Sequence, residues 1–338
     1  MPIDIVLDAM GSDKAPEPEI RGAFLATRLL DVRVHLVGPE ELLRPKLREC
    51  LKVYSKQNRP PVFLVQASEW ISMDDKAALA VRSKRDSSMR VALKMVREGR
   101  AAGFVTAGNT GAAMATAKMV LGSLAGIDRP ALATSLPTTT GSPCVLLDVG
   151  ANVDSDPENL VQFAVMGHVF AKNVLRVNHP RVGLLSIGEE DGKGNSLTRD
   201  TLPLLRELKG INFIGNVEGR DLFNGHCDVA VCDGFVGNVA LKTCEGTAKL
   251  LSVSLRESLK STVTSQVGAL LSKKAFTAFK KRLDYSEYGG AQLLGVRGPC
   301  IVGHGSSNER AIMNGIRIAA EFAQAEVNSG IEAALAAR

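Results

Sequence analysis

The strongest constraint in this 338-residue sequence is the regular alternation of short apolar runs with helix-type segments. We expect strands at residues 3–7, 33–37, 62–65, 103–106, 144–147, 182–187, 213–215, 229–232 and 301–302. Helical patterns fall at residues 16–30, 87–99, 111–120, 157–171, 197–208 and 307–330. A strand followed by a helix, many times over, predicts a largely parallel α/β sheet that is covered by helices on both faces.

Composition and length agree with this fold class. Aromatic residues make up only 4% of the chain while glycine occurs 32 times, which disfavours a β-sandwich and favours many tight strand-to-helix turns. No repeat or low-complexity linker interrupts the chain. We therefore expect residues 1–338 to form a single large α/β domain.

The segment 239–285 breaks the alternation, because it contains no strand pattern. Leu251, Leu255 and Leu259 recur at i+4 spacing, and an apolar stripe continues beyond them. This spacing predicts two helices that form a hairpin projecting from the sheet. The second helix is basic and contains Lys273, Lys274, Lys280, Lys281 and Arg282.

Glycine-rich polar loops follow six of the predicted strands. They span residues 8–13, 107–111, 148–152, 187–195, 233–238 and 304–308. In open α/β sheets ligands bind beyond the carboxyl ends of the strands, and helix N-termini there present free N–H groups to anions. We expect the six loops to meet at one edge of the sheet and to bind a phosphate-sized anion.

Other classes of site are disfavoured. The run from Gly188 to Gly194 resembles a phosphate-binding loop, but its glycine spacing is one residue short and Lys193 is followed by glycine; no G-x-G-x-x-G motif follows a strand. The six cysteines form no C-x-x-C pair and have no histidine at zinc-ligand spacing, so we expect buried free thiols in a reducing cytosol and no metal. Neither ATP, NAD nor another cofactor is expected.

The charge and hydropathy of the chain indicate its surroundings. A net charge of +5 is too weak to indicate nucleic-acid binding, but it suits an acidic partner or an anionic substrate. The N-terminus has no basic region typical of a signal peptide, and no run of about 18 uncharged apolar residues predicts a membrane span. We expect a cytoplasmic protein.

Four side chains are candidates for catalysis. Lys193 lies between two glycines and is suited to contact phosphate or a carbonyl, although an ordinary surface lysine is the alternative. Asn109 and Asn238 can donate amide hydrogen bonds to an oxyanion, although Asn109 is equally suited to cap a helix. Asp233 ends an apolar strand, where a carboxylate needs a partner; it is suited to act as a base or to orient Lys193 or Lys242, although an N-cap or turn role is the alternative.

Further loop residues are candidates for substrate binding. Lys242 is either an anion ligand or part of a solvated helix face, and His304 is either an acid–base group or a structural histidine. Ser307 is better suited to capping than to nucleophilic attack. The candidate set is Asp8, Gly108, Thr110, Gly194, Asn195, Gly237, Lys242, His304 and Ser307.

The same loops carry a resemblance to the phosphate acyltransferase family called PlsX, the acyl-carrier-protein:phosphate acyltransferases. The matching segments span almost the whole chain: residues 7–11, 86–89, 107–112, 147–152, 187–190, 193–195, 233–238, 288–291, 294–296 and 304–307. The first loop departs from the family pattern, since Ser12 and Lys14 stand where glycine and histidine are usual. Arg297 replaces a common asparagine.

The resemblance implies a Rossmann-like α/β/α sandwich akin to phosphotransacetylase and isocitrate dehydrogenase. It implies transfer of a fatty acyl group from acyl carrier protein to inorganic phosphate, which gives acyl-phosphate for phospholipid synthesis. It also implies a homodimer and loose membrane attachment through the hairpin, near the downstream glycerol-phosphate acyltransferase. The basic hairpin and the cluster of Arg82, Lys84, Arg85 and Arg90 are candidate docking surfaces for the acidic carrier or for anionic lipid.

Three rival hypotheses remain. One is a phosphotransacetylase-type enzyme that uses acyl-CoA, whose chemistry is nearly identical. The second is an NAD-dependent decarboxylating dehydrogenase with Asp148, Asp154 and Asp156 as metal ligands, although their spacing fits a turn better. The third is a non-catalytic membrane scaffold, which explains the helices but leaves the six polar loops without a role.

Overall fold

A computed structural model describes residues 1–54, 61–283 and 289–337, and the strands within these ranges form one eleven-stranded sheet. Its strand order is β3-β2-β1-β4-β11-β10-β5-β6-β9-β7-β8. The strands are β1 (Ile3–Asp8), β2 (Val32–Gly38), β3 (Val62–Gln66), β4 (Gly103–Thr106), β5 (Ala131–Leu136), β6 (Cys144–Leu147), β7 (Arg181–Leu185), β8 (Asn212–Val217), β9 (Val229–Val231), β10 (Ala291–Leu294) and β11 (Cys300–Val302). All nine predicted strands are present, and β5 and β10 are additional.

Strand direction divides the sheet into two parallel halves. Strands β3, β2, β1, β4 and β11 run one way, and β6, β9, β7 and β8 run parallel to one another on the far side. Between them, β10 is antiparallel to β11 and to β5, and β5 is antiparallel to β6. The two halves therefore run in opposite directions. The prediction that all six polar loops meet at one edge of a single parallel sheet is wrong in this respect.

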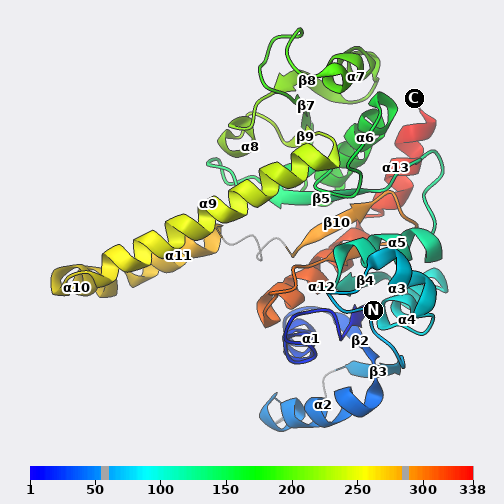
Figure 1. Cartoon of the computed structure of the whole chain (residues 1–338), viewed down its shortest axis with the longest axis vertical. Coiled ribbons are helices and arrows are strands. Elements are labelled where there is room, and N and C mark those ends of the chain that lie inside the picture. Colours follow the sequence, from blue (N-terminus) through cyan, green and yellow to red (C-terminus); the bar gives the residue numbers. More distant parts are fainter. Residues whose placement is uncertain (55–60, 284–288, 338) are drawn as a thin grey trace.

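Helices cover both faces of the sheet, as the alternation of the sequence predicts (Figure 1). They are α1 (Glu17–Leu29), α2 (Glu40–Tyr54), α3 (Ala77–Ser83), α4 (Ser88–Arg97), α5 (Thr110–Val120), α6 (Pro157–Asn173), α7 (Ser196–Glu207), α8 (Asp221–Asn224), α9 (Gly234–Lys260), α10 (Val263–Leu271), α11 (Lys273–Leu283), α12 (Glu309–Gln324) and α13 (Val327–Ala336). The fold is a mixed, mostly parallel α/β sandwich of the Rossmann-like kind.

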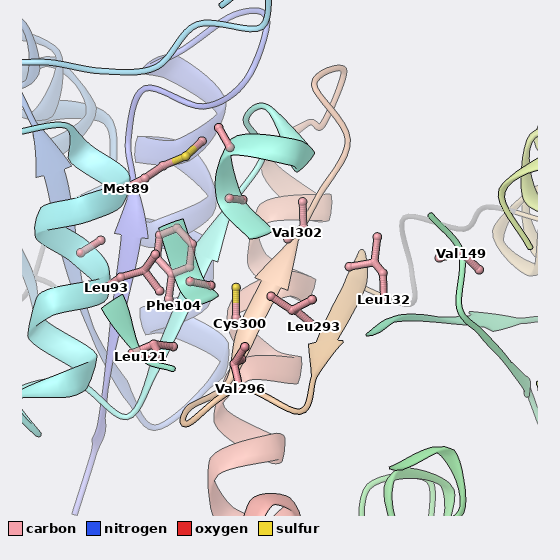
Figure 2. Close-up of a cluster of buried hydrophobic side chains, with 14 of the residues drawn as sticks. Met89, Leu93, Phe104, Leu121, Leu132, Val149, Leu293, Val296, Cys300 and Val302 are labelled. Atoms are coloured by element: carbon pink, nitrogen blue, oxygen red, sulfur yellow. The ribbon is translucent and has the colours of Figure 1, made fainter. Parts of the chain in front are cut away.

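The buried side chains of each strand alternate between faces, which assigns the helices to layers. On β1, Val6 packs in one apolar cluster with α4 and α5, while Ile5 and Leu7 pack in another with α1 and α12. On β6, Leu146 belongs to the first cluster and Val145 packs with α6. The first cluster thus continues across the junction of the two halves, and Figure 2 shows it passing through β11 and β10 toward the loop that follows β6.

Helices α9, α10 and α11 project from the sheet as an arm (Figure 1). The sequence predicts two helices here, and the structure has three, because Thr262 caps a new helix by accepting a hydrogen bond from the Ser265 N–H at 3.1 Å. In α9 only Gly234 and Gly237 are buried. The side chains of Lys280, Lys281 and Arg282, together with residues 284–288, lie outside the described part of the structure. Within the described ranges, none of the helices combines the length and the apolar composition that a membrane span requires.

Two helical glycines allow a matched test of packing. A Cβ atom at Gly22 would lie 2.6 Å from the Cβ of Ile312, where α1 contacts α12, whereas a Cβ at Gly246 in α9 would meet nothing within 4 Å. Gly22→Ala should therefore lower the free energy of unfolding by about 1–3 kcal/mol through overpacking. Gly246→Ala should leave it unchanged or raise it by up to about 1 kcal/mol, because alanine favours helix.

Denaturant titration of both variants checks this pair. Equal effects of the two substitutions would contradict the close approach of α1 and α12.

Candidate active site at the strand ends

The loops after β1, β4 and β11 converge, and we call residues 8–14, 106–111 and 303–308 the N-terminal loop group. The Asp13 N–H donates to the Gly305 carbonyl at 2.8 Å, and the Gly303 N–H donates to the Thr106 carbonyl at 2.7 Å. A Cβ at Gly11 would lie 2.7 Å from the Gly108 nitrogen. Glycine is required at Gly11 because the two loops touch through their backbones.

Asp8 lies beneath this group instead of in the open site. Its carboxylate is 1% exposed and accepts hydrogen bonds from the Thr106 hydroxyl at 2.7 Å and from the Met10 N–H at 3.1 Å. The Thr106 oxygen accepts the Gly108 N–H at 3.0 Å. Burial raises the pKa of Asp8 against these hydrogen bonds. Asp8 therefore positions Gly108 through Thr106.

Asn109 caps α5. Its side-chain oxygen accepts the Ala112 N–H at 3.0 Å, and its amide donates to the carbonyls of Met73 and Asp75 at 3.2 and 3.1 Å. Both ends of the side chain are therefore engaged, which favours the capping alternative over an oxyanion donor. Thr110 is exposed at the first position of the helix.

His304 and Ser307 border a small pocket beside α12. The Nδ1 atom of His304 lies 2.8 Å from the Ser306 Oγ, and the Ser307 N–H donates to the His304 carbonyl. The pocket has a volume of ≈ 120 Å³ and is lined by Thr106, Gly290, Gly303 and Ala311 as well. This volume is well below the roughly 300–1,000 Å³ of typical organic-ligand sites.

The loops after β6, β7 and β9 form a second cluster, and we call residues 148–153, 186–195 and 233–242 the C-terminal loop group. Asp148 is 0% exposed. Its two oxygens accept hydrogen bonds from the backbone N–H groups of Leu132, Gly150, Ala151 and Asn152. Burial raises the pKa of this carboxyl even so. Asp148 therefore stabilises the turn that follows β6, as its spacing in the sequence favours.

The start of α9 packs tightly on this turn. A Cβ at Gly237 would lie 1.8 Å from the Asp148 carbonyl oxygen, and the Gly234 N–H donates to the Asn152 carbonyl at 2.8 Å. Gly237 is therefore required for the close approach of helix and turn. Asn238 is exposed next to it and faces Gly150.

The charged candidates on α9 have local partners. Asp233 caps the helix by accepting the Val236 N–H at 3.0 Å. The Lys242 ammonium lies 2.8 Å from the Glu245 carboxylate on the exposed helix surface. This pair favours the solvated-face alternative for Lys242.

Lys193 differs from these residues. Its stem crosses Gly188, and within the described residues its ammonium has neither a hydrogen bond nor an ion pair. Gly194 has a positive φ of 105°, and Asn195 caps α7 by accepting the Thr198 N–H at 2.9 Å.

The acids of the same loop are largely neutralised. Glu189 pairs with Arg220 at 2.9 Å and Asp191 with Arg206 at 2.6 Å, which lowers the pKa of Asp191. Glu190 remains as a loop carboxylate, with an oxygen beside Gly188. Lys193 is thus the cation of this loop that can bind an anionic ligand.

Glu19 is a functional candidate that the sequence patterns missed. It lies on α1, is 0% exposed, and accepts the Ser12 N–H at 2.8 Å, while its second oxygen has no partner in the described structure. Burial, and to a smaller degree the nearby Asp8, raise its pKa to about 7. A glutamate in the first turn of a helix is usually a solvated helix-dipole residue, so no sequence signal separates Glu19 from exposed Glu17.

No hydrogen bond within the described ranges joins the two loop groups. The same ranges contain no set of three or more His, Cys, Asp or Glu side chains placed to hold a metal ion. All six cysteines are free thiols; four are buried, and Cys50 and Cys244 are half-buried.

Comparisons with known proteins agree over the full chain. A family model described as "Fatty acid synthesis protein" matches residues 3–330. A relative named phosphate acyltransferase from Acidobacterium capsulatum is 68% identical, covering 99% of this chain and 97% of that protein. A second relative of that name, from Koribacter versatilis, is 61% identical and covers 100% and 94%.

Two solved phosphotransacylase structures are among those that share this fold. A phosphotransacetylase from Streptococcus pyogenes aligns with a TM-score of 0.64 at 17% identity, covering 96% of this chain and 94% of that one. A branched-chain phosphotransacylase from Enterococcus faecalis V583 aligns with a TM-score of 0.59 at 14% identity, covering 95% and 99%. At these identities the likeness shows the shared fold alone.

Glu19 makes stability depend on pH. Its carboxyl has an ordinary pKa of 4.5 when unfolded and about 7 when folded, so folding is favoured by the protonated form. The stabilisation of the folded state by protonated Glu19 is complete below pH 4.5 and is lost as pH rises through 7. The free energy of unfolding falls by on the order of 3 kcal/mol in total. Glu19→Gln should remove this fall in the free energy of unfolding.

Denaturant titrations of both proteins from pH 5 to 8 measure the difference. Parallel pH profiles would show that Glu19 ionises normally in the folded protein.

Proposed function

The chain belongs to the PlsX family of phosphate acyltransferases and is an acyltransferase that transfers an acyl group to phosphate; we propose that its acyl donor is a fatty acyl thioester of acyl carrier protein. The product is then acyl-phosphate, which supplies phospholipid synthesis. The observation that carries the phosphate-binding part of the proposal is Lys193, which has no partner in the described residues and lies in a glycine-bordered loop at the N-terminus of α7.

Lys193 and the loop N–H groups bind the phosphate in this proposal. The ammonium has no competing carboxylate partner in the described structure, while Arg220 and Arg206 neutralise Glu189 and Asp191. A helix N-terminus next to a cation favours a dianion.

The reaction needs no protein nucleophile. A phosphate oxygen attacks the thioester carbonyl carbon, the tetrahedral intermediate collapses, and the carbon–sulfur bond breaks to release acyl-phosphate and a thiolate. With a thiol pKa near 8.5, the thiolate leaves with little acid help and takes its proton from solvent. The protein supplies positioning and charge stabilisation.

The oxyanion donors belong to the exposed side of the loops. Asn238 has an exposed amide beside Gly150, which suits a donor to the developing oxyanion. The side chain of Asn109 is engaged in capping, so the backbone next to it takes this role in the N-terminal loop group. Asp233, which caps α9, meets the carrier thiol and serves as base in the reverse reaction.

Both loop groups serve one substrate space in this proposal. Six steps separate β1 from β9 in the sheet, and neighbouring strands rotate by about 20–25°, which accumulates to roughly 130°. That rotation offsets much of the reversal in strand direction. The apolar cluster shared by both halves supports a fixed relation between them (Figure 2).

The basic surfaces suit the acidic carrier protein. Arg82 and Arg85 are exposed and have no partner among the described residues, whereas Lys84 is committed to Asp75 and to the Trp70 carbonyl. Lys273 and Lys274 are exposed on the arm. Uncommitted cations of this kind steer an acidic partner.

The arm provides dimer and membrane contacts in the same proposal. Leu250, Leu251 and Val253 on α9 are 64%, 53% and 46% exposed, which suits contact with a second copy. Val263, Leu270 and Leu271 near the tip are 77%, 72% and 82% exposed beside the two lysines, which suits an anionic membrane surface. There the enzyme would meet the glycerol-phosphate acyltransferase that uses its product.

The substrate assay and Lys193→Ala together test the activity. The purified protein should convert palmitoyl acyl carrier protein and phosphate into palmitoyl phosphate and free thiol, with little turnover of acetyl-CoA. Lys193→Ala should lower kcat/KM for phosphate by about 10²–10³-fold, because it removes a cation from the developing charge.

Lys209→Ala, at an exposed lysine after α7, is the matched control and should leave the kinetics unchanged. Preference for acetyl-CoA would favour a phosphotransacetylase-type enzyme, and full activity of Lys193→Ala would remove Lys193 from the mechanism.

The arm tip is tested by vesicle binding. Leu270→Ser combined with Leu271→Ser should weaken cosedimentation with phosphatidylglycerol vesicles several-fold, because two exposed leucines no longer enter the bilayer interface. Leu29→Ser on α1, which is also exposed, is the control. Unchanged binding of the double variant would place the membrane contact elsewhere.

A further inference from the structure

Five exposed apolar side chains gather in the C-terminal loop group, and we call them the apolar patch. They are Val153 at 61% exposed, Ile187 at 80%, Phe235 at 61%, Val236 at 37% and Val239 at 53%. The mechanism above gives none of them a role. Several large exposed apolar side chains in one place usually mark a binding surface.

The sheet register places the loops that carry the patch residues at the ends of neighbouring strands. Val231 on β9 pairs with Leu147 on β6 and with Leu184 on β7, so the three strands end at the same level. Val153, Ile187 and Phe235 each follow one of these strand ends. Adjacent strands lie about 5 Å apart, so the loops that continue them are immediate neighbours.

Hydrogen bonds and packing hold these loops together. The Gly234 N–H donates to the Asn152 carbonyl at 2.8 Å, which links the loop of Val153 to that of Phe235. Gly150 faces Asn238, one residue before Val239. Figure 1 shows α9 starting next to β9.

Within the apolar patch, Ile187 adjoins Lys193, whose ammonium has no partner in the described residues. Ile187 precedes Gly188, and the stem of Lys193 crosses that glycine, with its Cγ 2.9 Å from the position of a Gly188 Cβ. A cation and glycine-loop N–H groups therefore lie next to an apolar surface. This arrangement complements a ligand with an anionic head and an apolar tail.

The pocket in the N-terminal loop group does not suit a ligand with a long apolar tail. At ≈ 120 Å³, and lined by Thr106, His304 and Ser307, it is too small and too polar for a long alkyl chain.

We infer that the apolar patch binds the acyl chain of the thioester substrate and of the acyl-phosphate product. The patch holds the first methylenes beyond the reacting carbonyl, while Lys193 holds the phosphate. The inference rests on the proposed function and identifies the residues that select long chains. Each methylene that leaves water contributes about a fourfold gain in affinity, so a chain that follows the patch gains far more than a short one.

Chain-length kinetics test the inference on the full-length protein. Palmitoyl and butyryl thioesters of the same carrier protein are compared at saturating phosphate for wild type, Ile187→Ser and Phe235→Ser. We expect each variant to lower kcat/KM at least tenfold for the palmitoyl substrate and by less than about threefold for the butyryl substrate. Ile187→Leu should restore the palmitoyl activity.

Leu29→Ser and Leu42→Ser, at exposed leucines of α1 and α2, are the controls. They should leave kcat/KM unchanged for both substrates. The replaced patch residues are more than half exposed, and a thermal melt of each variant confirms that it is folded.

Two results would overturn the inference. One is an equal loss for both chain lengths. The other is a loss accompanied by dissociation of the oligomer in sedimentation, which would make the patch a contact between copies of the chain. Failure of the proposed function looks different, because wild type itself would then turn over neither thioester.

Discussion

The antiparallel pairing of β10 with β11 and β5 is the constraint on which the rest of the structure depends. It joins two parallel half-sheets that run in opposite directions, and it lets one apolar cluster continue from Met89 and Phe104 through Leu293 to Val149. Each half then presents its own group of strand-end loops. A long sheet with a reversal at its centre can present two such groups, whereas a uniformly parallel sheet presents them along one edge.

Most polar side chains in these loops hold the loops in place. Asp148 accepts four backbone N–H groups, Asp8 positions Gly108 through Thr106, and Asn109 and Asp233 cap helices. Buried carboxylates need such partners, because an unpaired charge in the interior is costly. The consequence is a rigid frame in which few charged groups remain open to a ligand, and Lys193 is one of them.

Acyl transfer to phosphate requires two different kinds of surface within one site. The phosphate needs cations and N–H donors, and a fatty acyl chain needs an apolar surface. The C-terminal loop group contains both kinds of group: Lys193 with the N–H groups of its glycine loop, and the exposed side chains of Ile187 and Phe235. The start of α9 belongs to the same loop group, and the helix continues from there into the arm.

The sequence by itself determined nine of the strands, many of the helices that alternate with them, and the family. Apolar runs and helical spacing identified nine strands, and the glycine loops identified where helices begin, because these signals arise from local backbone preferences and periodicity. The tertiary structure alone decided three matters. It added β5 and β10, whose short mixed runs carry no clear period but whose pairing reverses the sheet. It gave Asn109 hydrogen-bond partners and Lys242 an ion-pair partner, whereas Lys193 has none in the described residues. It buried Glu19 beside Ser12, which raises its pKa, while Glu17 on the same helix is exposed. Pairing partners, burial and charge commitment depend on residues far apart in the chain, and no local pattern encodes them.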